Sequence, residues 1–100
     1  MVEVIWSDNA LSDIEEIAAY IERDSKHYAS LLVSEIFERG NLLSYFPRIG
    51  RKVPERNAPQ IREIQVPPYR VIYKLAKEEI LILTVLHSRR NVKKLLRRLH

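Results

Sequence analysis

The chain has 100 residues, of which 46% are hydrophobic and 30% are charged, and its formal net charge at neutral pH is +4. We expect a single domain over residues 1–100, because this length supports one modest hydrophobic core but not two domains. The chain has no cysteine, which excludes disulfides, thiolate zinc sites and cysteine nucleophiles. No apolar stretch is long enough to span a membrane and the N-terminal region is acidic, unlike a signal peptide, so we expect a cytoplasmic protein without a membrane partner.

The N-terminal half predicts one strand and two helices. Residues 2–6 are rich in β-forming side chains, and Ser7 supplies N-cap chemistry for a segment in which apolar residues recur at helical spacing over residues 11–21. A second helical stripe covers residues 28–43 and ends before Pro47. Two helices joined by so short a connection should pack as an antiparallel hairpin.

The C-terminal half predicts a sheet. After a loop over residues 47–59, three β-prone runs follow, at residues 61–66, 69–75 and 80–86. Their connections are short enough only for antiparallel neighbours. The last run is apolar on both faces and should be the central strand, and the early strand over residues 2–6 could complete the sheet.

The expected fold is therefore α+β in the order β-α-α-β-β-β, with the helical hairpin packed on a small antiparallel sheet. Apolar residues at helical spacing also allow a short basic helix over residues 91–99.

The positive charge is concentrated at the C-terminal end. Residues 86–100 contain six of the 17 lysines and arginines and no acidic residue. The rest of the chain has 11 basic and 13 acidic residues, so a body of −2 carries a tail of +6. Such an asymmetry indicates an anionic or acidic partner.

Strand parity predicts which side chains share a face, because successive side chains point to opposite sides of a sheet. With the hairpin on the more apolar face, four polar side chains should reach solvent on the other face: Glu63, Gln65, Arg70 and Lys74. The last strand would bring His87, Arg89 and Arg90 close to them. We therefore expect a polar cleft with several guanidinium groups.

Short motifs spread over nearly the whole chain resemble a known family. They are Trp6-Ser7, Tyr20-Ile21, Phe46–Arg51, Val53–Glu55, Ile61–Ile64, Tyr69–Tyr73 and Val85–Arg90. In this order and spacing they resemble the RelE/ParE superfamily, the toxins of type II toxin–antitoxin modules. The fold of that family agrees with the order of elements expected above.

The resemblance implies a small toxin that is neutralised by a cognate antitoxin encoded beside it, whose C-terminal segment wraps the basic surface of the toxin. RelE-like members cut messenger RNA in the ribosomal A site, whereas ParE-like members poison DNA gyrase. A homodimer through an edge strand or the first helix is compatible with the sequence. A chain that has lost toxicity and retains only antitoxin binding or dimerisation is compatible with it too.

If the chain is a nuclease, the resemblance assigns three catalytic roles. Metal-free RNA cleavage needs a base for the 2′-hydroxyl proton, cations at phosphorus and an acid for the leaving oxygen. Arg70 matches a phosphate-contacting arginine of the nuclease branch, Glu55 matches a catalytic carboxylate, and His87 lies near a terminal histidine of the same members. The other candidates for contacts with nucleic acid or target are all basic: Arg62, Lys74, Arg89, Arg90, Lys93 and Lys94.

Two departures favour the ParE-like branch. Glu63 and Gln65 stand at outward positions of a strand on which RelE carries lysines, and the family's tyrosine near the C-terminal end has no counterpart after Tyr73. The Leu86–Asn91 segment also looks more like the ParE branch. In this reading the basic C-terminal residues make the contact with gyrase.

Simpler structural roles are open for the same residues. Arg70 could be a structural cation paired with Glu63 on the neighbouring strand. His87 could cap its strand, and the tail could be an amphipathic helix that packs on the sheet with its charges in water. The three histidines, at positions 27, 87 and 100, lack the spacing of metal ligands, so neither a metal site nor a cofactor is predicted.

Overall fold

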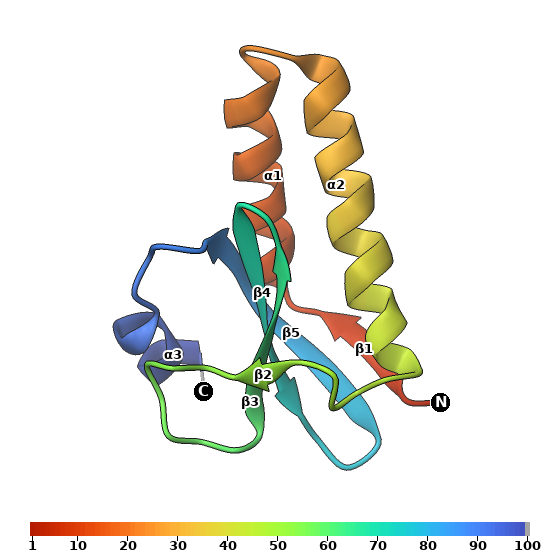
Figure 1. Cartoon of the computed structure of the whole chain (residues 1–100), viewed down its shortest axis with the longest axis vertical. Helices are drawn as coiled ribbons and strands as arrows, with labels where there is room; N and C mark the ends of the chain where they lie inside the picture. Colours follow the sequence, from red (N-terminus) through yellow and green to blue (C-terminus); the bar gives the residue numbers. More distant parts are fainter. Residues whose placement is uncertain (100) are drawn as a thin grey trace.

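The computed structural model describes residues 1–99 as a single sheet with helices on both of its faces (Figure 1). In chain order the elements are β1 (Glu3–Trp6), α1 (Asp8–Glu22), α2 (Lys26–Asn41), the 3-10 helix η1 (Leu42–Ser44), β2 (Arg51–Lys52), β3 (Ile61–Val66), β4 (Tyr69–Leu75), β5 (Glu79–His87) and α3 (Lys93–Leu99). The predicted α+β order is confirmed, including the short C-terminal helix. His100, one of the three histidines considered above, lies outside the described residues.

The five strands form a mixed sheet in the order β1-β5-β4-β3-β2. Strands β2 to β5 are antiparallel to their neighbours, as the short connections predict, but β1 lies parallel to β5. The sheet is therefore mixed rather than purely antiparallel. The direction of β1 is set by its pairing with β5, which lies far away in the sequence, and no short-range pattern specifies it. The two-residue strand β2 lies within the predicted loop and is too short to leave an alternating pattern.

Side-chain caps and apolar stripes account for the two long helices. The Ser7 hydroxyl accepts a hydrogen bond from the Ala10 N–H at 3.0 Å, and the Ser25 hydroxyl accepts one from the Tyr28 N–H at 3.0 Å. The helices α1 and α2 pack as the predicted hairpin, whose far turns project beyond the sheet (Figure 1). Within residues 1–99, no helix has the length and apolar character needed to cross a membrane.

The first hydrophobic core lies between the hairpin and the sheet. Its buried residues include Ile14, Leu32, Ile36, Val71 and Tyr73. Trp6 closes this core near the end of α2: its ring centroid lies 4.7 Å from that of Phe37, and a Cβ added at Gly40 would lie 2.4 Å from the indole carbons. A side chain at Gly40 would therefore displace Trp6.

A second, smaller core covers the opposite face of the sheet. It consists of Val53, Ile61, Ile72, Leu83, Leu86, Val92 and Leu96. The expectation that this face shows Glu63 and Arg70 to solvent is wrong, because their exposed fractions are 1% and 3%. The apolar residues of the basic tail fold back on this face and bury both charged side chains together with the core.

Candidate functional site

Arg70 lies at the centre of a buried ionic cluster. On β4 it shares a face with Ile72, directed away from the hairpin. Its Nη1 donates to Glu63 Oε1 at 2.8 Å and to Glu55 Oε1 at 3.1 Å, and its Nη2 forms a second hydrogen bond to Glu55 and one to the backbone carbonyl of Arg90. The two carboxylates thus hold one guanidinium from two sides. We call Glu55, Glu63 and Arg70 the ionic cluster.

Glu63 has further donors that satisfy its second oxygen. Its Oε2 accepts from Arg51 Nε at 2.6 Å and from Gln65 Nε2 at 3.1 Å. The side chain of Glu63 is fully buried, whereas that of Arg51 is largely exposed. Hydrogen bonds of this charge-assisted kind offset part of the free-energy cost of burying the Glu63 side chain.

The hydrogen bonds of the ionic cluster shift two pKa values in opposite directions. Hydrogen bonding to Glu55 raises the pKa of Arg70, and hydrogen bonding to Arg70 lowers the pKa of Glu55, while burial opposes both shifts. Each charge therefore stabilises the other. Both Nη atoms of Arg70 thus donate to protein acceptors in this structure.

The ionic cluster makes the stability of the fold depend on pH through Glu55. Because the pKa of Glu55 is lower in the folded chain than the usual 4.5, its carboxylate contributes stability above that value, and the contribution is lost as pH falls through the folded pKa. We expect the urea midpoint of unfolding to fall more steeply between about pH 5 and about pH 3 in the wild type than in Glu55→Gln. The exposed Glu79→Gln variant should follow the wild type. Equal steepness in all three would show that Glu55 is not coupled to folding.

The same cluster holds the beginning of the C-terminal segment. Glu55 Oε2 accepts a hydrogen bond from the Val92 N–H at 3.3 Å, and Arg70 donates to the carbonyl of Arg90. Val92 and Leu96 are fully buried in the second core. Arg70 and Glu55 thus connect the sheet to the segment that leads into α3.

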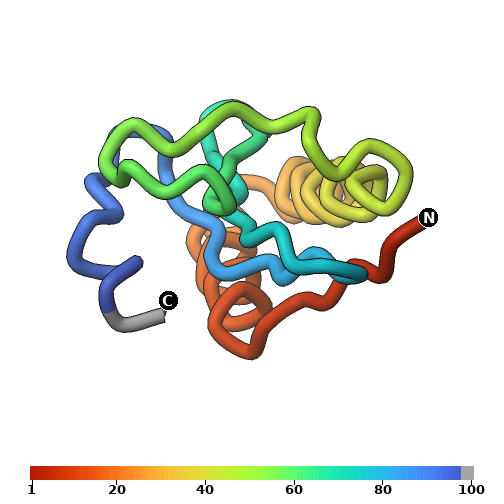
Figure 2. The backbone as a smooth tube through the Cα atoms, turned by 90° about the horizontal axis from the view of Figure 1, so that it is seen from below, coloured from red at the N-terminus to blue at the C-terminus, as the bar shows by residue number. Residues whose placement is uncertain are grey.

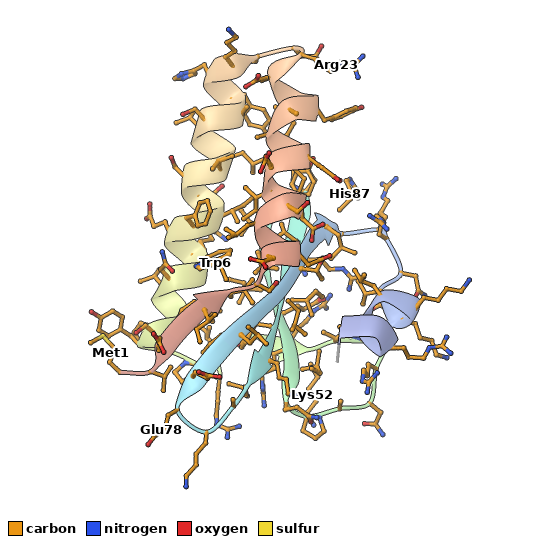
Figure 3. The ribbon with its side chains drawn as sticks, turned by 180° about the vertical axis from the view of Figure 1, so that it is seen from behind. Met1, Trp6, Arg23, Lys52, Glu78 and His87 are labelled. Atoms are coloured by element: carbon orange, nitrogen blue, oxygen red, sulfur yellow. The ribbon has the colours of Figure 1, made fainter. Side chains whose placement is uncertain are left out.

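His87 lies on the other face of the sheet. It is the cross-strand partner of Tyr69, whereas Arg70 is paired with Leu86, so the side chains of His87 and Arg70 point to opposite faces. Figure 3 shows His87 at the end of β5 beside α1. Its Nδ1 accepts from the Arg89 N–H at 3.2 Å, and its ring stands edge-on to Tyr69 with centroids 5.8 Å apart. The structure brings Glu55 and Arg70 together and separates His87 from both.

The six basic binding candidates divide into two groups. Arg62 Nη1 donates to the Gly50 carbonyl at 2.9 Å, and Lys74 is half-buried, so both belong to the sheet surface. The other four are exposed, as is Arg97 on α3, which the sequence analysis did not select. We call the set Arg89, Arg90, Lys93, Lys94 and Arg97 the basic tail surface. In the part of the chain that the structure describes, none of its side chains forms an ion pair.

The sequence predicted that Arg70 is a site residue, but not that two carboxylates and a backbone carbonyl accept hydrogen bonds from it. A carboxylate on the adjacent strand was the one available signal, since Glu63 shares the outward parity of Arg70. The contributions of Glu55 and of the Arg90 carbonyl come from loops that meet only in the folded chain. Among residues 1–99, no three histidine or acidic side chains are grouped so that they could hold a metal ion.

Comparisons with known proteins agree with this fold. Residues 4–92 match the family model described as the ParE toxin of the type II toxin–antitoxin system parDE. Toxin ParE3 of Caulobacter vibrioides is 37% identical over 93 residues, which is 92% of each chain.

Two solved structures are also similar. A chain from the chromosomal ParDE system of P. aeruginosa has a TM-score of 0.71 and 22% identity, over 87% of this chain and 96% of that one. The free E. coli toxin RelE, in a doubly substituted form, has a TM-score of 0.70 and 15% identity, over 99% of this chain and 98% of that one. At these identities the structural matches show the fold alone.

Proposed function

The chain belongs to the ParE toxin family of type II toxin–antitoxin systems, and on this premise we propose that it acts on DNA gyrase by binding it, without cleaving RNA, and that a cognate antitoxin holds it inactive. The basic tail surface makes the contact with the target. The ionic cluster holds α3 against the sheet through hydrogen bonds to the preceding residues, and it has no catalytic role.

The state of Arg70 carries this proposal. RNA cleavage without a metal needs a cation at the phosphate, with a base and an acid within reach of the same phosphodiester. Here Arg70 is enclosed by Glu55 and Glu63, and His87 points to the opposite face. This placement of the three side chains supports a toxin that binds its target rather than one that cleaves RNA.

The basic tail surface fits a target that presents many anionic groups. Its cations are exposed and have no ion-pair partner among the described residues, and they stand on or beside one short helix. DNA held by gyrase offers phosphates, and acidic surfaces of the enzyme offer carboxylates. Binding through several such contacts weakens steeply as salt concentration rises.

The test is a gyrase supercoiling assay with purified chain. We expect a variant in which Arg89, Lys93, Lys94 and Arg97 are changed to glutamine to lose at least about tenfold in potency, because it loses four charge contacts. The variant should keep the wild-type unfolding midpoint, since all four side chains are exposed. A matched control changes four exposed cations elsewhere to glutamine, namely Arg23, Lys26, Arg48 and Lys77. Equal potency of both variants and the wild type would refute the role of the basic tail surface.

Ribosome-dependent mRNA cleavage is the alternative target activity, and pulse labelling in cells separates it from gyrase poisoning. After induction without antitoxin, early loss of thymidine incorporation supports the gyrase proposal. Early loss of methionine incorporation, with cut messenger RNA, would contradict it. In that case Arg70 would have to leave Glu55 and Glu63 when the chain meets the ribosome.

A further inference from the structure

A pocket of about 460 Å³ lies between α1 and the end of β5. Pockets that hold small molecules begin at about 300 Å³, so this one has room for a ligand of nucleotide size. Its polar and aromatic lining residues are Asp13, Glu16, Tyr20, Tyr69, His87 and Arg90. Neither the ionic cluster nor the proposed contact with gyrase makes use of its aromatic rings or its carboxylates.

The spacing of these residues in α1 and in the sheet explains why they meet. Glu16 and Tyr20 are four residues apart in α1 and therefore lie on one face of the helix. Tyr69 and His87 are cross-strand partners at the facing end of the sheet. Arg90 belongs to the connection from β5 to α3. Figures 1 and 2 both show α1 apart from α3, so the pocket is separate from the helix that carries most of the basic tail surface.

The rings of the pocket offer a surface for stacking. Tyr20 is 67% exposed, and the rings of Tyr69 and His87 stand edge-on beside each other. Burial raises the pKa of the Tyr69 phenol, and the nearby phenols of Tyr28 and Tyr20 raise it further, so three tyrosines lie near one another. Exposed tyrosine and histidine rings are the side chains on which proteins stack unpaired nucleobases.

Glu16 is the carboxylate of the pocket that a ligand can use. Asp13 already serves the fold, because its Oδ2 accepts hydrogen bonds from the Val85 N–H at 3.0 Å and from the Thr84 hydroxyl. Glu16 is exposed, and within residues 1–99 no cation forms an ion pair with it. A carboxylate can accept two parallel hydrogen bonds. Guanine matches it, because its N1–H and its 2-amino group are adjacent donors on one edge of the base.

Arg90 adds a cation to the lining of the same pocket. Its side chain is exposed, and a guanidinium in this position can bind a phosphate through two N–H groups. The neighbouring Arg89 is exposed as well. A simple amine would be attracted by Glu16 and by the aromatic rings, but Arg90 would repel it. A ligand with a flat base and a phosphate uses all three kinds of group.

We propose that this pocket binds a guanine nucleotide, with the base stacked on Tyr20, its donor edge on Glu16 and its phosphate at Arg90. The nucleotide is either free or an unstacked guanosine in single-stranded DNA, which present the same chemistry. The inference goes beyond the proposed function, and it depends neither on gyrase as the target nor on an antitoxin.

The test measures binding of guanosine, inosine and adenosine 5′-monophosphates to the full chain by isothermal titration calorimetry. We expect the guanosine nucleotide to bind about tenfold more tightly than the inosine nucleotide, which lacks the 2-amino donor. The adenosine nucleotide should bind about 100-fold more weakly, because its edge places an acceptor against Glu16.

Two variants with matched controls test the residues. Glu16→Gln should weaken binding of the guanosine nucleotide about tenfold, whereas Glu15→Gln, on the same helix but outside the pocket, should not change it. Tyr20→Ala should also weaken binding about tenfold through lost stacking. Its control is Tyr45→Ala, which removes a tyrosine that is 64% exposed and outside the pocket. All four side chains are exposed, so the unfolding midpoints should stay close to that of the wild type.

A second titration identifies the source of the nucleotide. It uses short oligothymidine strands that differ in one central base, guanine or adenine. Binding of the free guanosine nucleotide that depends on Glu16 supports a free ligand, and a preference for the guanine strand that depends on Glu16 supports single-stranded DNA. No preference for guanine in either titration would overturn the inference, as would equal binding by Glu16→Gln and Glu15→Gln. Neither titration contains gyrase, so a failure here leaves the proposed function standing, and a failure to inhibit gyrase leaves this inference standing.

Discussion

Replacing Arg70 with alanine is expected to lower the free energy of unfolding by about 3–5 kcal/mol, because Glu55 would lose its counter-charge and the fully buried Glu63 would keep only the largely exposed Arg51. The substitution also removes the hydrogen bond to the Arg90 carbonyl. In a domain of 100 residues, such a loss lowers Tm by roughly 12 °C or more. Urea denaturation followed by circular dichroism would measure it.

Arg89→Ala is the matched control, since it removes an exposed arginine outside the ionic cluster and should leave the unfolding midpoint within about 0.5 kcal/mol of the wild type. Loss of toxicity in Arg70→Ala, taken alone, would therefore report on folding. If Arg70→Ala kept the wild-type free energy of unfolding and yet lost toxicity, that result would contradict this account. It would mean that Arg70 acts on the target, and the nuclease alternative would regain its main residue.

Leu96→Ala is expected to cost about 2–5 kcal/mol, because Leu96 is fully buried in the second core and its loss leaves a cavity. The same helix carries an exposed control, Lys94→Ala, which should cost less than about 0.5 kcal/mol. Both free energies of unfolding come from the same urea titrations. The comparison shows how much the apolar side and the charged side of α3 each contribute to the free energy of unfolding.

The outcome also affects how the tail is tested. If Leu96 is part of the core, deleting the tail would remove Val92 and Leu96 as well as the cations, and inactivity would not identify the target contact. Substituting only the exposed cations avoids this problem. Equal stability of Leu96→Ala and the wild type would show that α3 does not hold the second core together.

Local chemistry was sufficient to predict the helices and most of the strands. The predicted cap Ser7 contacts a backbone N–H three residues away, and the apolar stripes repeat at helical spacing. In β4, alternation correctly separates Val71 and Tyr73 on the hairpin face from Ile72 on the other. These predictions succeed because each depends on interactions within one or two turns, or within one strand.

The sequence by itself therefore determined the order of elements, the hairpin, the strand faces and the basic character of the tail. Only the tertiary structure decided that β1 runs parallel to β5, that Arg70 is enclosed by Glu55 and Glu63, and that His87 lies on the other face. The sequence left open whether the apolar residues of the tail pack on the sheet. In the structure Val92 and Leu96 do so, and the face on which a polar cleft was expected is covered by the second core. The physical reason is distance along the chain: Glu55, Arg70 and Val92 meet through loop closure and burial, which the local pattern around each residue does not encode.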